Sequence, residues 1–270
     1  MGSPLFSWTG LYANMLNNSD ANPNPAYPTN SQRAPFQVRL INLSGASVLA
    51  MCEQSKALFT ANIGPDLSET WVCGDATGTQ VVAWKTKYWT MLEQFTQPLT
   101  ASRTLYGTRL RYGANANHWM WFLATHLSAG LDAVTYGYRL SQAQERREII
   151  ANLGTDRWIM YSDDNEYFDR AEGDGALVYT RDVAGYDYQF SSSFKERMAN
   201  SQYRTIHGGA GQLAGPAMID FVWTQSGRLT RKPRVVNHHH GQMFFTDFPG
   251  TTVTYASDHN WFRIVSGCYT

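Results

Sequence analysis

The sequence predicts a mainly β fold, either a sandwich or a jelly roll, with two or so inserted helices and an extended N-terminal arm. Two observations favour this class: short aromatic segments bounded by turn residues recur along the chain, and a Pro/Asn-rich stretch opens it. The chain has 270 residues, of which 43% are hydrophobic and 14% aromatic, so it can bury a full core. We expect an arm over residues 1–35 and a single β-rich globular domain over residues 36–270.

The expected arm differs in composition from everything that follows it. It holds half of the ten prolines of the chain and very few charged side chains. Such a segment cannot bury enough of its own apolar surface to offset roughly 1–2 kcal/mol per residue of backbone ordering. We therefore expect large apolar side chains to anchor the arm, either on its own domain or on a neighbouring subunit. These assembly anchors are Phe6, Trp8, Leu11 and Tyr12.

From residue 36 onward the chain is interpreted mainly as strands. Residues 36–40 alternate between apolar and polar side chains, which indicates a half-buried strand. Ser44 and Gly45 then supply a turn before the next apolar run. Further strands are expected at residues 48–52, 70–73, 80–85, 104–112, 134–140, 176–181, 186–190, 218–224, 253–255 and 261–265.

Two segments interrupt these strands. Ser141 followed by Gln144 forms a capping box and Gly154 is a natural stop, so residues 141–154 are predicted to contain a helix. The run at residues 117–129 is apolar on nearly every side, which indicates a buried helix or a buried strand pair. It contains His118 and His126, which we interpret as core histidines.

Charge and composition exclude several partners. The 22 basic and 22 acidic residues cancel, so neither nucleic acid nor an anionic membrane is a favoured partner. Charged residues make up only 16% of the chain, and the resulting uncharged polar surface suits packing against proteins or sugars. No signal peptide and no apolar run long enough to span a membrane is found in the sequence.

A dense acidic segment is the first candidate functional site. Between residues 163 and 174 the sequence carries six carboxylates, and such density favours a hard cation with oxygen ligands, with calcium as the candidate. Paired carboxylates in the same segment could also perform glycosidic acid/base catalysis. A solvated acidic loop is the plainer interpretation. The candidate metal ligands are Asp163, Asp164, Glu166, Asp169 and Asp174.

Three consecutive histidines form the second candidate site. Adjacent side chains of a strand point to opposite faces, so only His238 and His240 could share a metal ion. A third ligand would have to come from elsewhere, such as His207, Asp258 or His259. The residues that flank the histidines favour a simple turn instead.

No specific catalytic motif stands out, and no cofactor is expected apart from calcium in the acidic segment. We hypothesise a non-enzymatic structural subunit of a large self-assembling particle or lattice, such as a viral shell or tail component or an intracellular protein crystal. Its partner would be itself, and its location the virion or an intracellular assembly. A carbohydrate-binding β-sandwich module that recognises glycans, with possible help from calcium, is the alternative. A hydrolase that uses the carboxylates of residues 163–174 is the third hypothesis.

Overall fold

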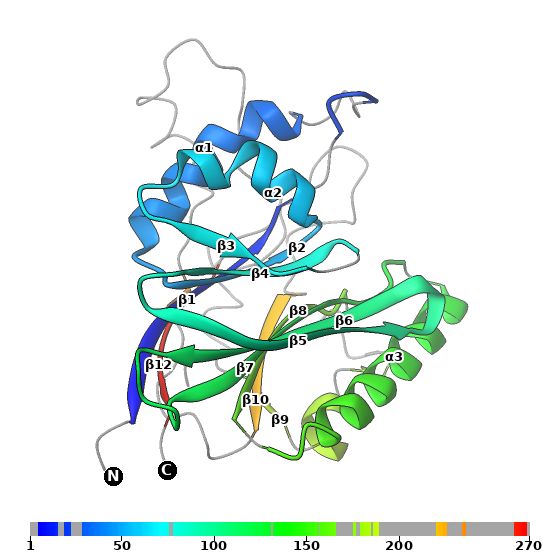
Figure 1. The fold of residues 1–270 in the computed structure, drawn as a ribbon. Coiled ribbons are helices and arrows are strands. Elements are labelled where there is room, and N and C mark those ends of the chain that lie inside the picture. The colour runs from blue at the N-terminus through cyan, green and yellow to red at the C-terminus, as the bar shows by residue number, and fades with distance from the viewer. Residues whose placement is uncertain are drawn as a thin grey trace.

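Two six-stranded β-sheets pack face to face in the computed structural model (Figure 1). The structure describes residues 5–15, 19–22, 29–75, 78–130, 132–155, 157–165, 175–176, 179–184, 186–188, 220–225, 234–235 and 262–268. The expectation of a mainly β protein with a few helices is confirmed. The architecture is not plainly a jelly roll, because each sheet contains a parallel strand pair, whereas jelly rolls are built from antiparallel Greek keys.

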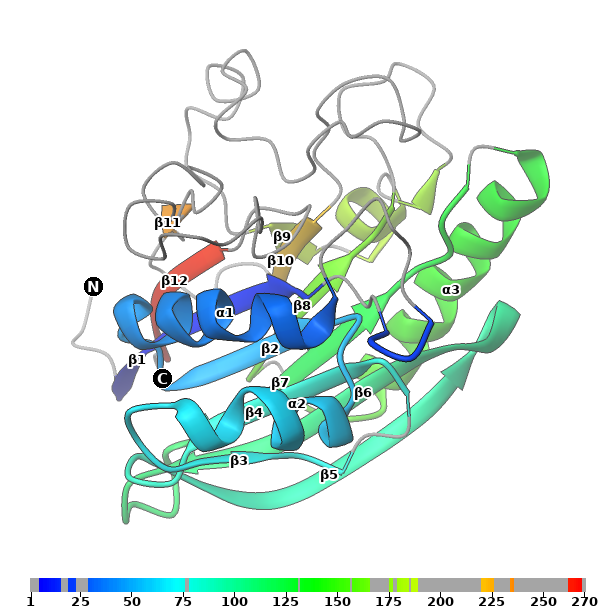
Figure 2. The same cartoon turned by 90° about the horizontal axis from the view of Figure 1, so that it is seen from above.

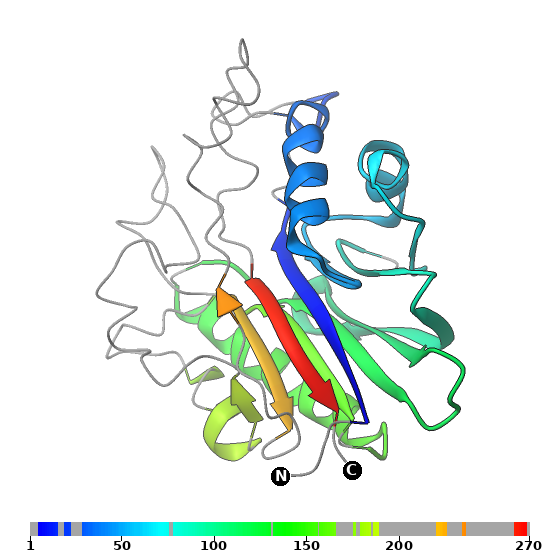
Figure 3. The same ribbon diagram turned by 90° about the vertical axis from the view of Figure 1, so that its left-hand side faces the viewer.

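The first sheet has the strand order β11-β12-β1-β2-β4-β3. Strand β1 lies inside this sheet, antiparallel to β12 and parallel to β2, and Figure 3 shows it beside β12. Two helices, α1 (Asn30–Ser44) and α2 (Lys56–Asn62), lie on the outer face (Figure 2). The strands are β1 (Phe6–Asn14), β2 (Val48–Cys52), β3 (Trp71–Cys73), β4 (Gln80–Lys85), β11 (Arg234–Val235) and β12 (Phe262–Cys268).

The second sheet has the order β5-β6-β7-β8-β10-β9, with β7 and β8 as its parallel pair. Helix α3 (Ala133–Ala151) lies on its outer side (Figure 1). Short turns of helix occur at η1 (Gly64–Asp66), η2 (Thr100–Ser102) and η3 (Tyr179–Val183). The strands are β5 (Trp89–Leu99), β6 (Arg103–Tyr112), β7 (Trp119–His126), β8 (Trp158–Asp163), β9 (Tyr186–Tyr188) and β10 (Asp220–Gln225).

The main core lies between the two sheets and is rich in aromatic rings. Trp8 of β1 and Trp89 of β5 both contact Phe122 of β7 edge to face, with ring centroids 5.8 and 5.2 Å apart. A second apolar cluster fills the space between the first sheet and the helices α1 and α2. In the described residues no helix is both long and apolar enough to cross a membrane.

The expected arm is wrong for Phe6–Asn14, which is an interior strand. Phe6, Trp8 and Tyr12 pack between the two sheets, and Leu11 packs under α1 and α2. All four expected anchors are therefore buried in the core of their own chain. The mean composition of residues 1–35 concealed a run of β-forming aromatic residues at one end of the segment. The expected single domain over residues 36–270 stays a prediction.

Two expected strands are instead helices. Residues 36–40 lie in α1, where the side chain of Gln32 accepts a hydrogen bond from the Thr29 amide (2.9 Å) and Gly45 ends the helix in the left-handed conformation. Residues 134–140 belong to α3, which has Asp132 as its N-cap and begins at Ala133, eight residues before the predicted start at Ser141. An alternation over only five residues fits one turn of an amphipathic helix as well as a strand. The capping residues at the two ends of the segment therefore distinguish a helix from a strand.

The remaining expectations agree in part with the structure. The run at residues 117–129 contains one strand, β7, and residues 179–181 of an expected strand lie in η3. Residues 253–255 lie outside the described part of the chain. The predicted strands 48–52, 80–85 and 104–112 are confirmed as β2, β4 and β6, and those at 70–73, 186–190, 218–224 and 261–265 overlap β3, β9, β10 and β12.

Candidate functional site

The two parallel strand pairs end at one place between the sheets. Asn14 is the last residue of β1 and lies opposite Cys52, the last residue of the parallel strand β2. In the other sheet His126 ends β7 opposite Asp163, the last residue of the parallel strand β8. Glu53 follows β2 directly. The carboxyl ends of four strands thus bring Asn14, Glu53, His126 and Asp163 together, and we call these four residues the strand-end cluster.

Hydrogen bonds join the cluster across the two sheets. The Nδ2 atom of Asn14 donates to Glu53 Oε1 (3.3 Å) and to Asp163 Oδ2 (3.1 Å). The Nε2 atom of His126 lies 3.4 Å from the same Asp163 oxygen. Asn14 and Asp163 are almost fully buried, whereas Glu53 is half-buried. One amide therefore holds two carboxylates in place, and one of these carboxylates also holds the imidazole.

The backbone on each side of the cluster adopts unusual conformations. Glu53 and Asn165 have φ angles of 55° and 52°, in the left-handed region that non-glycine residues rarely enter. The amide of Asn165 donates to Asp163 Oδ1 (3.0 Å), and its side chain donates to the Leu127 carbonyl (3.0 Å). These bonds fix the orientation of the Asp163 carboxylate and connect the turn after β8 to the loop after β7.

Helix α3 holds the loop that follows His126. The Nη1 atom of Arg139 donates to the carbonyls of Ser128 and Gly130, each at 2.9 Å. The side chain of Gln142 accepts from the Ser128 amide (2.9 Å) and donates to the Ser128 hydroxyl (2.8 Å). Both helix side chains are buried, so their polar atoms position the loop without contact with solvent.

Two stacked tyrosines lie on the core side of the cluster. Tyr12 precedes Asn14 by two positions in β1, and Tyr161 precedes Asp163 by two positions in β8, so each ring shares a strand face with a cluster residue. The rings are parallel, with centroids 6.4 Å apart. Burial raises the pKa of the Tyr161 hydroxyl above its ordinary value, so it stays protonated and neutral.

The donor atoms of the cluster suit a divalent cation. One ligand atom each from Glu53, His126 and Asp163 lies within 4.8 Å of the others. Two carboxylates at this separation repel each other in a partly buried site, and a cation would relieve this repulsion. Carboxylate oxygens are the ligands that Mg²⁺ and Mn²⁺ prefer, while the imidazole would also suit Zn²⁺. The residues therefore fit a bound cation.

Of the two predicted metal ligands that the structure describes, one joins the cluster. Asp163 does, whereas the Asp164 carboxylate receives hydrogen bonds from Arg146 and Trp223 on the other side of the strand end. The candidates Glu166, Asp169, Asp174, His238 and His240, and the suggested third ligands His207, Asp258 and His259, lie outside the described residues.

Asn14 and Glu53 were not among the residues predicted from the sequence, and His126 was interpreted as a core histidine. A usable signal exists, because each cluster residue comes at or just after the end of an apolar strand run, where ligands of parallel sheets bind. A further acidic residue, Asp220, begins β10 and pairs in register with Asp163, which places its backbone at the same edge.

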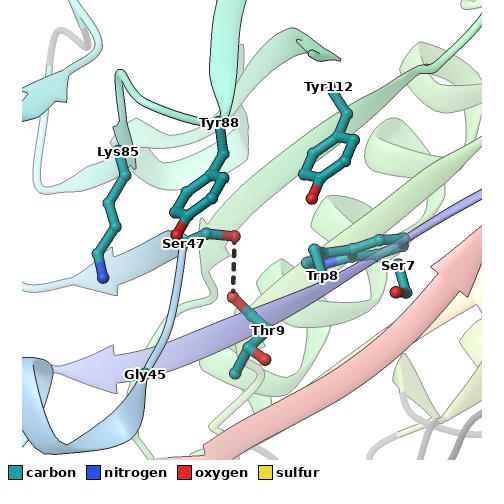
Figure 4. A pocket seen from close by; sticks show the side chains of 8 residues that line it. All are labelled: Ser7, Trp8, Thr9, Gly45, Ser47, Lys85, Tyr88 and Tyr112. Atoms are coloured by element: carbon teal, nitrogen blue, oxygen red, sulfur yellow. Dashed lines mark hydrogen bonds between the residues drawn. The ribbon is translucent and has the colours of Figure 1, made fainter.

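A separate pocket lies at the opposite end of β1, away from the cluster (Figure 4). Its volume is about 240 Å³. The Ser47 hydroxyl accepts a hydrogen bond from Trp89 Nε1 (3.0 Å) and donates to the Thr9 carbonyl (3.4 Å), while the Lys85 amine is paired with Glu69. Several polar groups of the pocket are thus already engaged. Its lining residues are Ser7, Trp8, Thr9, Gly45, Ser47, Lys85, Tyr88 and Tyr112.

Solved structures share this two-sheet fold over nearly its whole length. A Bacteroides thetaiotaomicron protein of the endonuclease/exonuclease/phosphatase family matches with a TM-score of 0.71 and 12% identity, covering 100% of both chains. A mannosyl-6-phosphatase from B. thetaiotaomicron VPI-5482 matches with a TM-score of 0.69 and 11% identity, covering 96% of this chain and 99% of the other. D. rerio TDP2 complexed with single strand DNA product gives 0.67 and 12%, covering 97% and 99%.

The fold is therefore that of the endonuclease/exonuclease/phosphatase proteins. No protein-family model and no functionally curated sequence matches the chain. At 11–12% identity the similarity establishes the fold, and the activity has to be argued from the cluster.

These similarities correct the functional hypothesis. A mannosyl-6-phosphatase shares the fold over 96% of this chain, and a protein of the endonuclease/exonuclease/phosphatase family shares it over 100%, so the interpretation as a non-enzymatic, self-assembling virion subunit is wrong. The exclusion of nucleic acid is wrong for the same reason, since a protein of this fold is bound to single strand DNA. Overall neutrality excludes a general attraction to polyanions, but it says nothing about a local site. The three aromatic residues expected to anchor an assembly, Phe6, Trp8 and Tyr12, pack in the core between the two sheets.

Proposed function

We propose that this protein is a divalent-cation-dependent hydrolase that cleaves phosphate esters. The observation that carries the proposal is the strand-end cluster, in which two carboxylates, an amide and an imidazole meet at the carboxyl ends of two parallel strand pairs. The similarity of the fold to that of phosphatases supports the same chemistry.

Each residue of the cluster has a role that follows from its contacts. Glu53 and Asp163 supply the oxygen ligands of Mg²⁺ or Mn²⁺, and the Asn14 amide keeps their carboxylates oriented through its two hydrogen bonds. A bound cation would supply Lewis-acid polarisation of the phosphoryl oxygens. The protein need not provide a covalent nucleophile, since water can attack phosphorus directly.

His126 is the proton-transfer residue of the proposal. Its Nε2 atom lies beside the Asp163 carboxylate, which orients the ring and favours a proton on that nitrogen. In the hydrolysis, a bond forms between phosphorus and the water oxygen and the ester P–O bond breaks. Nε2 can deliver a proton to the leaving alcohol, and the proton that the attacking water loses returns to the imidazole, so His126 ends in its starting state.

A hydrolysis assay on three substrates tests the proposal. The substrates are p-nitrophenyl phosphate, bis(p-nitrophenyl) phosphate and a single-stranded oligonucleotide, each with Mg²⁺ or Mn²⁺, then with EDTA, then with the metal restored. We expect hydrolysis of at least one substrate, its loss with EDTA and its return with metal.

Variants of the cluster complete this test. E53Q and H126N should each lower kcat/KM by on the order of 10²-fold or more. E93Q is the matched control, because Glu93 pairs with Arg109 on the far strands of the second sheet, and it should keep full activity. Absence of metal-dependent hydrolysis of all three substrates, or full activity of E53Q, would refute the proposed function.

A further inference from the structure

We propose that the buried ion pair between Arg146 and Asp164 is a positioning device for the carboxylate of Asp163. The inference rests on the proposed function, since it assigns Asp163 to the cation. It concerns two residues that are hydrogen-bonded to Ser162, Thr180 and Trp223, all outside the strand-end cluster.

The ion pair joins four parts of the chain in one buried network. Arg146 of α3 donates from Nη1 to Asp164 Oδ1 (2.5 Å) and to the Ser162 hydroxyl (3.1 Å), and from Nη2 to the Thr180 hydroxyl (2.8 Å). The indole Nε1 of Trp223 in β10 donates to Asp164 Oδ2 (2.9 Å). Both charged side chains are at most 1% exposed.

The network acts on the turn that carries the site. Asp163 and Asp164 are consecutive at the end of β8, and their side chains go opposite ways, one to the cluster and the other to α3. The next residue, Asn165, has the left-handed φ of 52° and donates its amide to Asp163 Oδ1. The bonds to Asp164 on the α3 side therefore fix the backbone orientation of this turn. The direction of the Asp163 carboxylate is fixed with it.

One face of α3 holds both loops of the site. Arg139, Gln142 and Arg146 are spaced three and four positions apart, which places them on the same buried side of the helix. The first two bind the loop after His126, and the third binds the turn after Asp163. Helix α3 thereby sets the relative positions of the imidazole and the carboxylate that meet in the cluster.

The chemistry of the network favours positioning over stabilisation alone. A buried ion pair loses its hydration, and apolar residues of similar volume often give equal or greater stability. Each oxygen of Asp164 is nevertheless fixed by a directional donor from a different element. Such a set of contacts determines the orientation of the Asp164 side chain. In many metal sites, hydrogen bonds from residues outside the ligand set orient the ligands in the same way.

The test measures cation affinity and fold stability separately. D164N keeps the shape of the side chain and removes its charge, and R147M, on the exposed neighbour of Arg146, is the matched control. We expect D164N to fold, to bind Mn²⁺ about 10-fold or more weaker by calorimetry, and to lose 10- to 100-fold in kcat with little change in KM. R147M should bind and turn over like the wild type.

Two further readouts distinguish the outcomes. Hydrogen exchange of the Asn165 amide should accelerate in D164N but not in R147M, and R146K should recover part of the affinity lost by R146M. Wild-type Mn²⁺ affinity and kcat in a D164N protein, even one with a lowered Tm, would overturn the inference and leave the proposed function standing. A wild-type protein that neither binds Mn²⁺ nor hydrolyses the substrates would overturn both.

Discussion

Gly10 of β1 provides a direct test of the packing between the two sheets. A Cβ atom added at this position would lie 2.4 Å from the hydroxyl oxygen of Tyr161 in β8, far inside van der Waals contact. The Tyr161 ring is fully buried and stacks on Tyr12, so it has little room to move. Such overpacking costs about 1–3 kcal/mol of unfolding free energy.

Removing the hydroxyl should remove this cost. The next atom of Tyr161, Cζ, would lie 3.5 Å from the added Cβ, which is an ordinary contact. In the Y161F background the G10A substitution should therefore be neutral or stabilise by about 0.4–1 kcal/mol, since alanine restricts the unfolded chain. The predicted coupling between the two substitutions is the difference, about 1–4 kcal/mol.

Urea denaturation of the wild type, both single variants and the double variant measures this coupling. Each free energy of unfolding is extrapolated to water with a common slope. If G10A costs the same in both backgrounds, the Tyr161 hydroxyl is not the atom that limits the approach of the sheets. If G10A has no effect in either background, β1 does not lie between β12 and β2, and the arm interpretation of this segment is restored.

Two further predictions concern pH and backbone strain. Burial raises the pKa of the Cys73 thiol from 9.0 to about 12, so the unfolded chain loses this proton at lower pH than the folded chain does. Stability should be constant below pH 9 and then fall by about 1.4 kcal/mol per pH unit from this thiol. The C73A variant should show a shallower fall in urea denaturation between pH 9 and 11, and an unchanged slope would contradict the prediction. Ala101 has a φ of 56°, where glycine is free of the steric cost that alanine carries. A101G should raise the free energy of unfolding by about 1 kcal/mol in the same assay, and a loss of stability would contradict it.

Sequence patterns predicted a strand well where the residues of that strand alone define it. The bounds of β4 (Gln80–Lys85) match the prediction, because a run of buried apolar residues between turn residues has few other conformations. Strand β5 (Trp89–Leu99) was missed, since much of it is exposed and polar and its partner β6 supplies the pairing. Pairing of this kind depends on distant residues, which one segment of sequence does not contain.

The site was difficult to predict because it depends on parallel pairing. Asn14 and Glu53 come together only when β1 and β2 lie side by side, and a parallel pair needs a crossover between its strands. That crossover contains α1, part of which was interpreted as the strand 36–40. Between β7 and β8 a helix was predicted at residues 141–154, but β8 itself (Trp158–Asp163) was not predicted as a strand, so this crossover was not recognised either. Without a recognised crossover, nothing in the sequence indicated that these strand ends meet.

The two crossovers explain why the cluster lies where it does. Each sheet contains one strand-helix-strand unit, β1-α1-β2 in the first and β7-α3-β8 in the second, with its helix on the outer face (Figures 1 and 2). Parallel strands of such a unit end at the same edge, where backbone order gives way to loops that can carry polar side chains. Because the two sheets pack face to face, the two edges meet. The hydrogen bond from Asn14 of one unit to Asp163 of the other is the direct result, and it makes the proposed cation site dependent on both sheets at once.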